Sequence, residues 1–252
     1  MNYKESIEQT KQGFEESFRD GAYYNKQTSD DLHLEMILQY IPVEPGMKIL
    51  DLGTGSGYLA FPFADKYKQA EIIGLDIVEK TLVDNKRKAE IEGINNLRFV
   101  SYDGVAFPFD DNSFDIVISR YALHHFPAIS DTFCEISRVL KQNGIFFLSD
   151  PTPNEDDIEH FVDKFMQMKK DGHIKFYTKN EWKELGNSVD LLYVDGFETN
   201  IRFPRKKGMG FEYEELISKH SEDVIRGYEV EIIEDEIWIT EKVNNLFFRK
   251  RK

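Results

Sequence analysis

Three glycines lie close together in the stretch Ile49-Leu50-Asp51-Leu52-Gly53-Thr54-Gly55-Ser56-Gly57. An apolar run typical of a buried strand precedes them, and a helical pattern follows. Glycines at such a junction let the backbone turn tightly and let a ligand approach main-chain amides with no Cβ in the way. Asp51, at the end of the strand, could reach an ammonium group of that ligand. Taken alone, the loop could also be a simple turn.

Two further acids follow later apolar runs. Asp76 ends the run Ile72–Leu75, and Asp103 with Gly104 follows Leu97–Ser101. Carboxylates at these strand ends suit the ribose hydroxyls and the amino edge of an adenosine ligand. Each acid also has a simpler role open to it, Asp76 as a helix N-cap and Asp103 as a turn residue. Together with the glycine loop, they predict one ligand crevice at the carboxyl edge of a sheet.

The elements that must position these residues alternate along the middle of the chain. We expect strands at Lys48–Leu52, Ala70–Leu75, Leu97–Ser101, Phe114–Ser119 and Gly144–Ser149, and helices near 57–68, 78–91 and 129–140. Strands alternating with helices of this length predict an α/β fold with a parallel sheet and helices on both faces. Residues 45–150 would then form a ligand-binding core.

The flanking regions have a different pattern. Residues 1–44 read as helical around a turn-rich segment at 20–25. After residue 150 we expect an inserted helical lid over 151–195, with one helix capped by Asn154 and another that opens on the capping box Thr178–Glu181 and stops at Gly186. Strands near 198–202 and 236–249, with a short helix near 212–219 between them, return to the sheet. All 252 residues are expected to form one domain.

Composition limits the function. The net charge of −14 disfavours nucleic acid and anionic membranes, and the basic clusters 205–207 and 249–252 read as a solvated turn and a solvated tail. No apolar run approaches the roughly 20 residues that span a bilayer. The N-terminus does not resemble a signal peptide. Cys134 is the single cysteine and is expected to pack within a helix, so a reducing cytoplasm fits. No metal site is expected.

The stretch from Met47 to Asp150 resembles the class I S-adenosylmethionine-dependent methyltransferases. It is most similar to the small-molecule branch that includes the ubiquinone/menaquinone C-methyltransferases. The motifs that carry the likeness, beyond the glycine loop, Asp76 and Asp103, are Phe107-Pro108-Phe109, Asn112-Ser113-Phe114-Asp115, Ser119-Arg120-Tyr121-Ala122-Leu123-His124-His125-Phe126 and Arg138-Val139-Leu140-Lys141-Gln142-Asn143-Gly144. The family has a Rossmann-like sheet of seven mostly parallel strands, the last of them antiparallel.

The resemblance implies a role for each matching residue. The loop Gly53, Thr54, Gly55 and Gly57 borders the methionine moiety of S-adenosylmethionine, and Asp51 holds its amino group. Asp76 binds the ribose, Ile77 lies against the adenine, and Asp103 with Gly104 holds the adenine amino edge. Ser119 and Arg120 lie beside the cofactor. Tyr24 lies in a segment that closes over the cofactor in related enzymes, although a plain core role is also open.

The resemblance also disfavours nucleic-acid acceptors. The N/D-P-P-Y/F element of amino-methylating nucleic-acid enzymes is absent, as is the Pro-Cys nucleophile of cytosine C5 enzymes. We therefore predict methyl transfer to a small organic acceptor, leaving S-adenosylhomocysteine as the product. Methyl transfer needs positioning more than a catalytic triad. The side chains that could act as a base are His124, His125, His173 and Tyr177.

Two other functions remain open at this level. One is a non-catalytic S-adenosylmethionine-binding sensor or partner subunit. The other is a nicotinamide-dependent oxidoreductase, which the glycine spacing opposes: in a G-x-G-x-x-G fingerprint the third glycine would stand where this chain has Tyr58. The pattern gives no acceptor identity and no oligomeric state.

Overall fold

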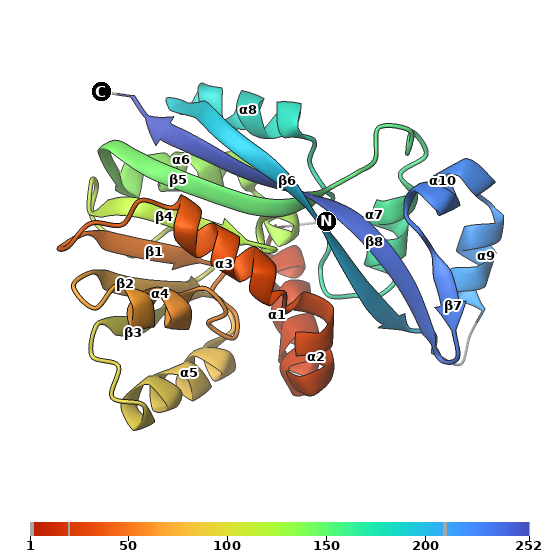
Figure 1. Ribbon diagram of the computed structural model, residues 1–252, viewed down its shortest axis with the longest axis horizontal. Coiled ribbons are helices and arrows are strands. Elements are labelled where there is room, and N and C mark those ends of the chain that lie inside the picture. The colour runs from red at the N-terminus through yellow and green to blue at the C-terminus, as the bar shows by residue number, and fades with distance from the viewer. Residues whose placement is uncertain (1–2, 20, 209–210, 252) are drawn as a thin grey trace.

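The computed structural model describes residues 3–19, 21–208 and 211–251, and within these ranges eight strands form one sheet (Figure 1). The strands are β1 (Lys48–Leu52), β2 (Glu71–Asp76), β3 (Leu97–Ser101), β4 (Phe114–Arg120), β5 (Leu140–Thr152), β6 (Leu191–Lys206), β7 (Glu231–Ile233) and β8 (Glu236–Lys250). The helices are α1 (Tyr3–Arg19), α2 (Gly21–Thr28), α3 (Asp31–Tyr40), α4 (Ala60–Lys66), α5 (Glu79–Ile91), the 3₁₀ turn η1 (Leu123–His125), α6 (Ile129–Val139), α7 (Phe161–Gln167), α8 (Lys179–Ser188), α9 (Glu212–Ser218) and α10 (Glu222–Gly227).

The strand order is β3-β2-β1-β4-β5-β8-β6, with β7 paired to β8. The first five strands pair in parallel, and β8 runs antiparallel to both β5 and β6. The expected Rossmann-like, mostly parallel sheet with an antiparallel last strand is confirmed. The short strand β7 was not expected. β5 runs past the expected end to Thr152, because β8 pairs with it as far as Lys242.

The parallel strands are buried on both faces, because neighbouring side chains along a strand point to opposite sides. Ile49 of β1 joins one apolar cluster, and Leu50 joins the other. Helices α3, α4 and α5 contribute side chains to the first cluster, and α6 and α8 contribute to the second. This alternation explains why the core strands read as continuous apolar runs in the sequence.

Helix α8 belongs to the layer that covers the sheet and is not part of a lid. Trp182 stacks on Phe133 of α6 at 5.8 Å between ring centroids, and both rings are buried. The expected stop at Gly186 is wrong, because α8 continues to Ser188. A Cβ at Gly186 would lie 2.7 Å from the Leu191 carbonyl oxygen. This glycine therefore serves close packing between the helix and β6.

Strands β6 and β8 extend as a long antiparallel ribbon beyond the parallel part of the sheet, as Figure 1 shows, and α7, α9 and α10 pack around it. Their side chains form a third apolar cluster, which includes Phe161, Phe165, Tyr213, Ile237 and Ile239. The helix expected near 212–219 is present as α9, and α10 was not expected. The helical insertion lies between the end of β5 at Thr152 and the start of β6 at Leu191. It is therefore shorter at both ends than the expected 151–195.

The N-terminal helices differ from expectation at one point. The segment expected to be a turn at 20–25 forms α2 from Gly21 onward; Asp20 lies outside the described residues. A long-range contact supports this helix: Gln27 Nε2 donates to the Pro204 carbonyl oxygen of β6 at 2.8 Å. Cys134 is exposed on α6, so its expected packing role is wrong. None of the helices within the described ranges combines the length and apolar character needed to cross a bilayer.

The capping box of α8 is confirmed and can be tested directly. The Glu181 amide donates to Thr178 Oγ1 at 3.3 Å, and the Thr178 amide donates to Glu181 Oε2 at 2.8 Å. We expect Thr178→Ala to lower the free energy of unfolding by about 1 kcal/mol, because an exposed cap is lost without a cavity. Thr178→Ser should retain most of it. Urea unfolding measures both; equal stability of the two variants would show that the cap contributes nothing.

Candidate active site

The glycine loop leaves β1 in a left-handed backbone conformation. The φ angles of Gly53, Gly55 and Gly57 are 71°, 50° and 80°. A Cβ at Gly53 would lie 2.5 Å from the Ala122 Cβ, so only glycine fits there. At Gly55 the nearest atom would be Phe18 Cζ at 3.4 Å. Gly55 therefore presents bare backbone to the space between the sheet and α1.

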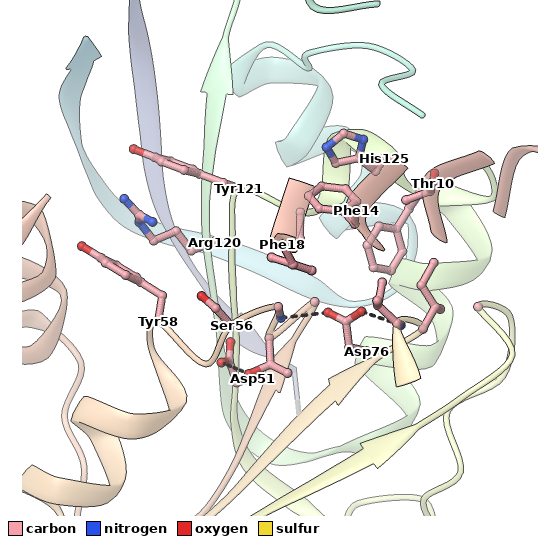
Figure 2. Close-up of a pocket in the computed structure, with 18 of the residues that line it drawn as sticks. Thr10, Phe14, Phe18, Asp51, Ser56, Tyr58, Asp76, Arg120, Tyr121 and His125 are labelled. Atoms are coloured by element: carbon pink, nitrogen blue, oxygen red, sulfur yellow. Dashed lines mark hydrogen bonds between the residues drawn. The ribbon is translucent and has the colours of Figure 1, made fainter. Parts of the chain in front are cut away.

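That space is a cavity of about 940 Å³ of empty volume, part of it open to solvent. It lies at the carboxyl ends of β1, β2 and β4 and beneath α1 and α2 (Figure 2). Of the residues expected to bind a cofactor, the cavity is lined by Tyr24, Asp51, Gly53, Thr54, Gly55, Asp76, Ile77, Gly104 and Arg120.

Asp51 is a buried carboxylate at the floor of this cavity. Its side chain is 2% exposed, and its Oδ2 accepts a hydrogen bond from Thr54 Oγ1 at 2.7 Å. Burial raises the pKa of Asp51 to about 7, although the Thr54 hydroxyl opposes that rise. The carboxylate would become fully ionised when a cationic group lies against it.

Asp76 ties the second strand to the glycine loop. Its Oδ2 accepts from the Gly55 amide at 2.8 Å, and its Oδ1 accepts from the Val78 amide at 2.9 Å, as Figure 2 shows. It is not the N-cap of α5, which is Val78. Burial raises the pKa of Asp76, against the effect of these amides. Each carboxylate oxygen retains a further lone pair for a ligand hydroxyl.

Arg120 is the cation of the first cavity. Its guanidinium lies 4.1 Å from the ring centre of Tyr58 and 3.8 Å from that of Tyr121. Its Nη2 donates to the Thr28 carbonyl oxygen at 2.8 Å, whereas its buried Nε has no hydrogen-bond partner among the described residues. The stacking fixes the plane of the guanidinium, so it can receive an anionic group in a defined orientation.

Three of the expected cofactor residues do not line the cavity. The exposed Asp103 uses its Oδ1 to accept from the Val105 and Ala106 amides at 2.9 and 3.1 Å. The Ser119 hydroxyl donates to the Leu52 carbonyl oxygen, within the sheet. Gly57 allows the loop to pack closely on the Phe61 ring, because a Cβ there would lie 2.5 Å from that ring.

The cover of the cavity comes from the N-terminal helices. Ile7, Thr10, Phe14 and Phe18 line it from α1, and Tyr24 and Thr28 line it from α2. The Phe18 and Tyr24 rings meet edge to face at 4.8 Å, and burial raises the pKa of Tyr24 to about 12. The sequence predicts helices in residues 1–44, but its pattern does not indicate that these side chains of α1 face a ligand site.

A second cavity of about 500 Å³ of empty volume adjoins the first. The side chains common to both are Phe14, Tyr24, Thr28, Tyr121 and His125. The residues that line only the second cavity come from distant segments: Gln27, His124, Pro151, Met166, Lys169, Asp171, Phe176, Ile201, Phe203, Arg205 and Glu241. The two cavities are therefore neighbours with one shared wall, an arrangement suited to two ligands that react with each other.

Of the four expected base candidates, His125 lies at that wall and His124 lies beside it. His125 lines both cavities, and its ring meets Phe14 edge-on at 4.9 Å. His124 lines the second cavity, and its Nδ1 lies 2.9 Å from Asp150 Oδ1. Burial lowers the pKa of both histidines well below the usual value and raises that of Asp150. Both imidazoles are therefore neutral near pH 7 and able to accept a proton.

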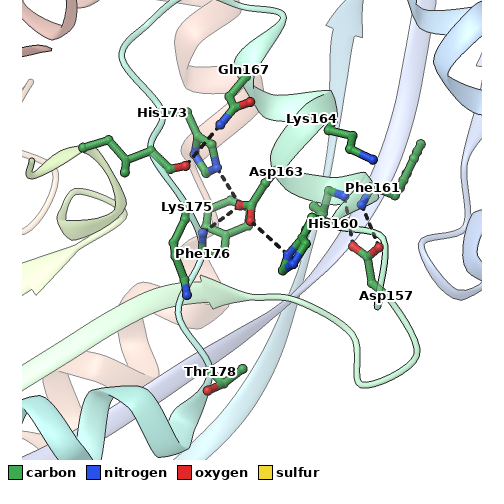
Figure 3. Close-up of polar contacts among 12 residues, drawn as sticks. Asp157, His160, Phe161, Asp163, Lys164, Gln167, His173, Lys175, Phe176 and Thr178 are labelled. Atoms are coloured by element: carbon green, nitrogen blue, oxygen red, sulfur yellow. Dashed lines mark hydrogen bonds and ion pairs between the residues drawn. The ribbon is translucent and has the colours of Figure 1, made fainter. Parts of the chain in front are cut away.

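The other two candidates face away from both cavities. His173 Nε2 lies 2.8 Å from Asp163 Oδ1, which also accepts from the Phe176 amide at 2.7 Å (Figure 3). Tyr177 packs against Trp182 with 4.4 Å between ring centroids. Neither residue lines either cavity, although the His173 ring meets the ring of His125 edge to face at 6.1 Å.

The start of α7 also differs from expectation. Asn154 does not cap it; instead Asp157 accepts from the Phe161 and Val162 amides at 2.7 and 3.0 Å (Figure 3). Asn154 instead donates to Tyr228 Oη and to the Gly227 carbonyl oxygen, both at 2.9 Å. Met166 of α7 and Lys169, Asp171 and Phe176 of the segment after it line the second cavity.

Two charged residues of the second cavity, Arg205 and Glu241, were not expected there from the sequence. Arg205 was expected in a solvated turn, but it is 6% exposed and lies in β6. Glu241 of β8 is 1% exposed and pairs with Ile201. The alternation along these strands does indicate their burial. Arg205 and Glu241 occupy positions whose side chains point to the same, apolar face as their buried neighbours two residues away.

Comparisons with known proteins agree with this geometry. A family model described as a methyltransferase domain matches residues 43–190. The uncharacterized methyltransferase YcgJ of Bacillus subtilis is 34% identical over 155 residues, which cover 61% of this chain and 60% of YcgJ. The ubiquinone/menaquinone biosynthesis C-methyltransferase UbiE of Dinoroseobacter shibae is 30% identical over 111 residues, 44% of each protein. The match thus spans about half the length of these curated relatives.

The fold is shared with solved structures as well. The crystal structure of YcgJ superimposes with a TM-score of 0.77 at 24% identity and covers 88% of this chain and all of that one. A putative methyltransferase from Bacillus halodurans gives 0.75 at 21% identity, over 87% of this chain and 99% of that one. The chain therefore belongs to the methyltransferase-domain family, and S-adenosylmethionine is its cofactor.

Proposed function

We propose that this protein transfers the methyl group of S-adenosylmethionine to a small organic acceptor. The observation that carries the proposal is the pair of adjoining cavities. The first contains the glycine loop, Asp51 and Asp76, and the second meets it at a wall that includes His125. A cofactor in the first cavity would present its methyl group to an acceptor in the second.

The residues of the first cavity fit the cofactor group by group. Asp51 suits the ammonium of the methionine moiety, and the unpartnered Nε of Arg120 suits its carboxylate. The amides of Gly53 and Gly55 border the same moiety, with Thr54 and Gly57 supporting the loop. Asp76 suits the ribose hydroxyls.

The adenine end is less enclosed. Ile77 and Gly104 line this end of the cavity, and Asp103 adjoins it with one carboxylate oxygen held by its own turn. Ser119 acts indirectly, because its bond to Leu52 holds the ends of β4 and β1 together. We assign adenine binding to Ile77, Gly104 and Asp103 on this basis.

The cofactor supplies a methyl group already activated by its positive sulfur, so the protein's main task is placement. Phe14, Phe18 and Tyr24 exclude water from above. The shared wall would place the acceptor against the methyl group, whose bond to sulfur would break as the new bond forms. The neutral His125 would accept the proton that a hydroxyl or amine acceptor loses. His124, held by Asp150, fixes the position of the adjoining ring.

The acceptor and the compartment follow from charge and size. A net charge of −14 repels polyanions, so we assign a small molecule and no nucleic acid as the acceptor. The second cavity is lined by side chains from several helices and strands, an arrangement suited to a small molecule. We place the protein in the cytoplasm, because a lone cysteine offers no internal disulfide.

Cofactor choice is the first test. We expect S-adenosylhomocysteine at a hundredfold over its Kd to raise the free energy of unfolding by about 2.7 kcal/mol, and NADH to leave it unchanged. Asp76→Ala should weaken S-adenosylhomocysteine binding by about 1–3 kcal/mol. Asp65→Ala, on the exposed face of α4, is the matched control. Calorimetry that detects NADH but not S-adenosylhomocysteine would favour the oxidoreductase alternative.

The pH dependence of binding tests Asp51. Its pKa of about 7 falls when the cofactor ammonium binds, so affinity is fully present above pH 7 and is lost as pH falls. We expect the Kd of S-adenosylhomocysteine to rise about tenfold between pH 8 and pH 6. Asp51→Asn should weaken binding and flatten this dependence, apart from a residual slope from Asp76. Calorimetry at both pH values measures it; an unchanged slope in Asp51→Asn would assign the titration elsewhere.

Turnover tests His125. We expect His125→Ala to lower kcat by about 10²–10⁴ for a hydroxyl acceptor, with cofactor affinity nearly unchanged. His173→Gln should lower the thermal midpoint and reduce turnover of the folded fraction far less than His125→Ala, because His173 bonds to Asp163 and lines neither cavity. The assay is release of S-adenosylhomocysteine with a panel of small acceptors. No turnover with any acceptor, despite tight cofactor binding, would favour the sensor alternative.

A further inference from the structure

The second cavity is unusually rich in charge for its size. Lys169, Asp171, Arg205 and Glu241 all line it, and the last three are each at most 6% exposed. They come from the segment after α7 and from the two strands of the ribbon. Burying charged groups is costly unless each is paired, so their partners decide what the cavity is built to hold.

One pair in the cavity is already satisfied. Lys169 Nζ lies 3.1 Å from Asp171 Oδ2, which compensates both charges. Against the effect of burial, the positive charges of Lys169 and Arg205 hold the pKa of Asp171 well below its usual range. The Asp171–Lys169 pair is therefore ionised and contributes no net charge.

Arg205 is different, because no carboxylate is bonded to it among the described residues. Among the described residues, no carboxylate lies within 4 Å of its guanidinium, and its one side-chain hydrogen bond runs from Nη2 to Met166 Sδ at 3.2 Å. Thioether sulfur is a weak acceptor. The buried Nε has no partner at all in the described part of the chain. A buried guanidinium thus faces the cavity with most of its donors unused.

The nearest acid does not neutralise Arg205. Glu241 Oε1 is buried without a hydrogen-bond partner among the described residues. Burial raises the pKa of Glu241 to about 8, although Arg205 opposes that rise. In its protonated form Glu241 offers a hydroxyl donor instead of a negative charge. With Glu241 protonated, the cavity has one surplus positive charge and a neutral donor.

We propose that the second cavity binds an acceptor that carries a carboxylate, which Arg205 holds at the end away from the cofactor. The guanidinium presents two parallel N–H donors, the geometry that matches a carboxylate. His125 and Phe14 belong to both cavities and Arg205 only to the second, so the acceptor's other end lies toward the methyl group. The inference rests on the proposed function, in which this cavity is the acceptor site.

A monoanion fits better than a phosphate. The surplus charge is a single unit, and Asp171 Oδ1 and Glu241 Oε1 both face this region without partners. A second negative charge on the ligand would meet the ionised Asp171. A carboxylate needs only the compensation that Arg205 supplies, with Glu241 as a second donor.

The test uses benzoate as the probe, with benzamide as its neutral counterpart and phenyl phosphate as the dianion. Each is titrated calorimetrically into the protein saturated with S-adenosylhomocysteine. We expect benzoate to bind more tightly than either. Arg205→Met should raise its Kd about 10- to 100-fold, the loss of hydrogen bonds to a charged group. Benzamide binding should change little in the same variant.

Arg202 provides a matched control on the same strand. It is exposed, and its guanidinium donates to the Glu229 carbonyl oxygen and to Glu231 Oε2 at 2.9 and 2.6 Å. Arg202→Met should leave benzoate binding unchanged. Because an unpaired buried charge is unfavourable, Arg205→Met should also keep or raise the thermal midpoint of the ligand-free protein.

Opposite results overturn the proposal. Benzoate that fails to bind the wild type, or that binds Arg205→Met as well as the wild type, shows that Arg205 does not hold a carboxylate. Tighter binding of phenyl phosphate shows that the site is built for a dianion. A lowered thermal midpoint with unchanged benzoate affinity shows a structural arginine. A second titration, of benzoate into the ligand-free protein, measures the anion site alone. Failure of S-adenosylhomocysteine to bind would therefore contradict the proposed function without deciding whether Arg205 holds a carboxylate.

Discussion

Parallel pairing of β1 with β2 and β4 is the constraint on which the site depends. The loops that follow these three strands all lie at one edge of the sheet. The backbone amides of each loop need hydrogen-bond acceptors. Asp76 supplies them for two strands at once, because it accepts from the Gly55 amide at the end of β1 and from Val78 at the end of β2. The same carboxylate that closes these turns is thereby fixed, facing the cavity, where a ribose can use its remaining lone pairs.

Sequence pattern predicted this half of the molecule because its determinants are local. Apolar runs buried on both faces define parallel strands, and glycines with positive φ mark the loop. The failures come from long-range contacts. Gly21–Thr28 forms a helix because Gln27 bonds to β6, and α7 is capped by Asp157 because Asn154 is used by Tyr228 and Gly227. The local sequence around these helices does not indicate which distant residues they contact.

The buried charges show a second limit of sequence pattern. Arg205 sits in a basic triplet that is typical of solvent-exposed turns, yet it lies on the inward phase of β6 with Ile201 and Phe203. Its neighbours Arg202 and Lys206 are exposed, as the alternation requires. Folding alone gains nothing from a guanidinium in that position, since an apolar residue would pack there at lower cost. Such a residue departs from the pattern because of what the cavity binds.

The family match covers only part of the lining of each cavity. The matched residues, 43–190, contain the glycine loop, Asp51 and Asp76, to which we assign the cofactor. Phe14 and Tyr24, which precede this range, line both cavities, whereas Arg205 and Glu241, which follow it, line only the second. Because the ribbon of β6 and β8 leaves the parallel sheet before reaching the second cavity, its inward residues can change without disturbing the ends of the parallel strands. In the proposed function, the ribbon can therefore alter acceptor choice without altering the cofactor site.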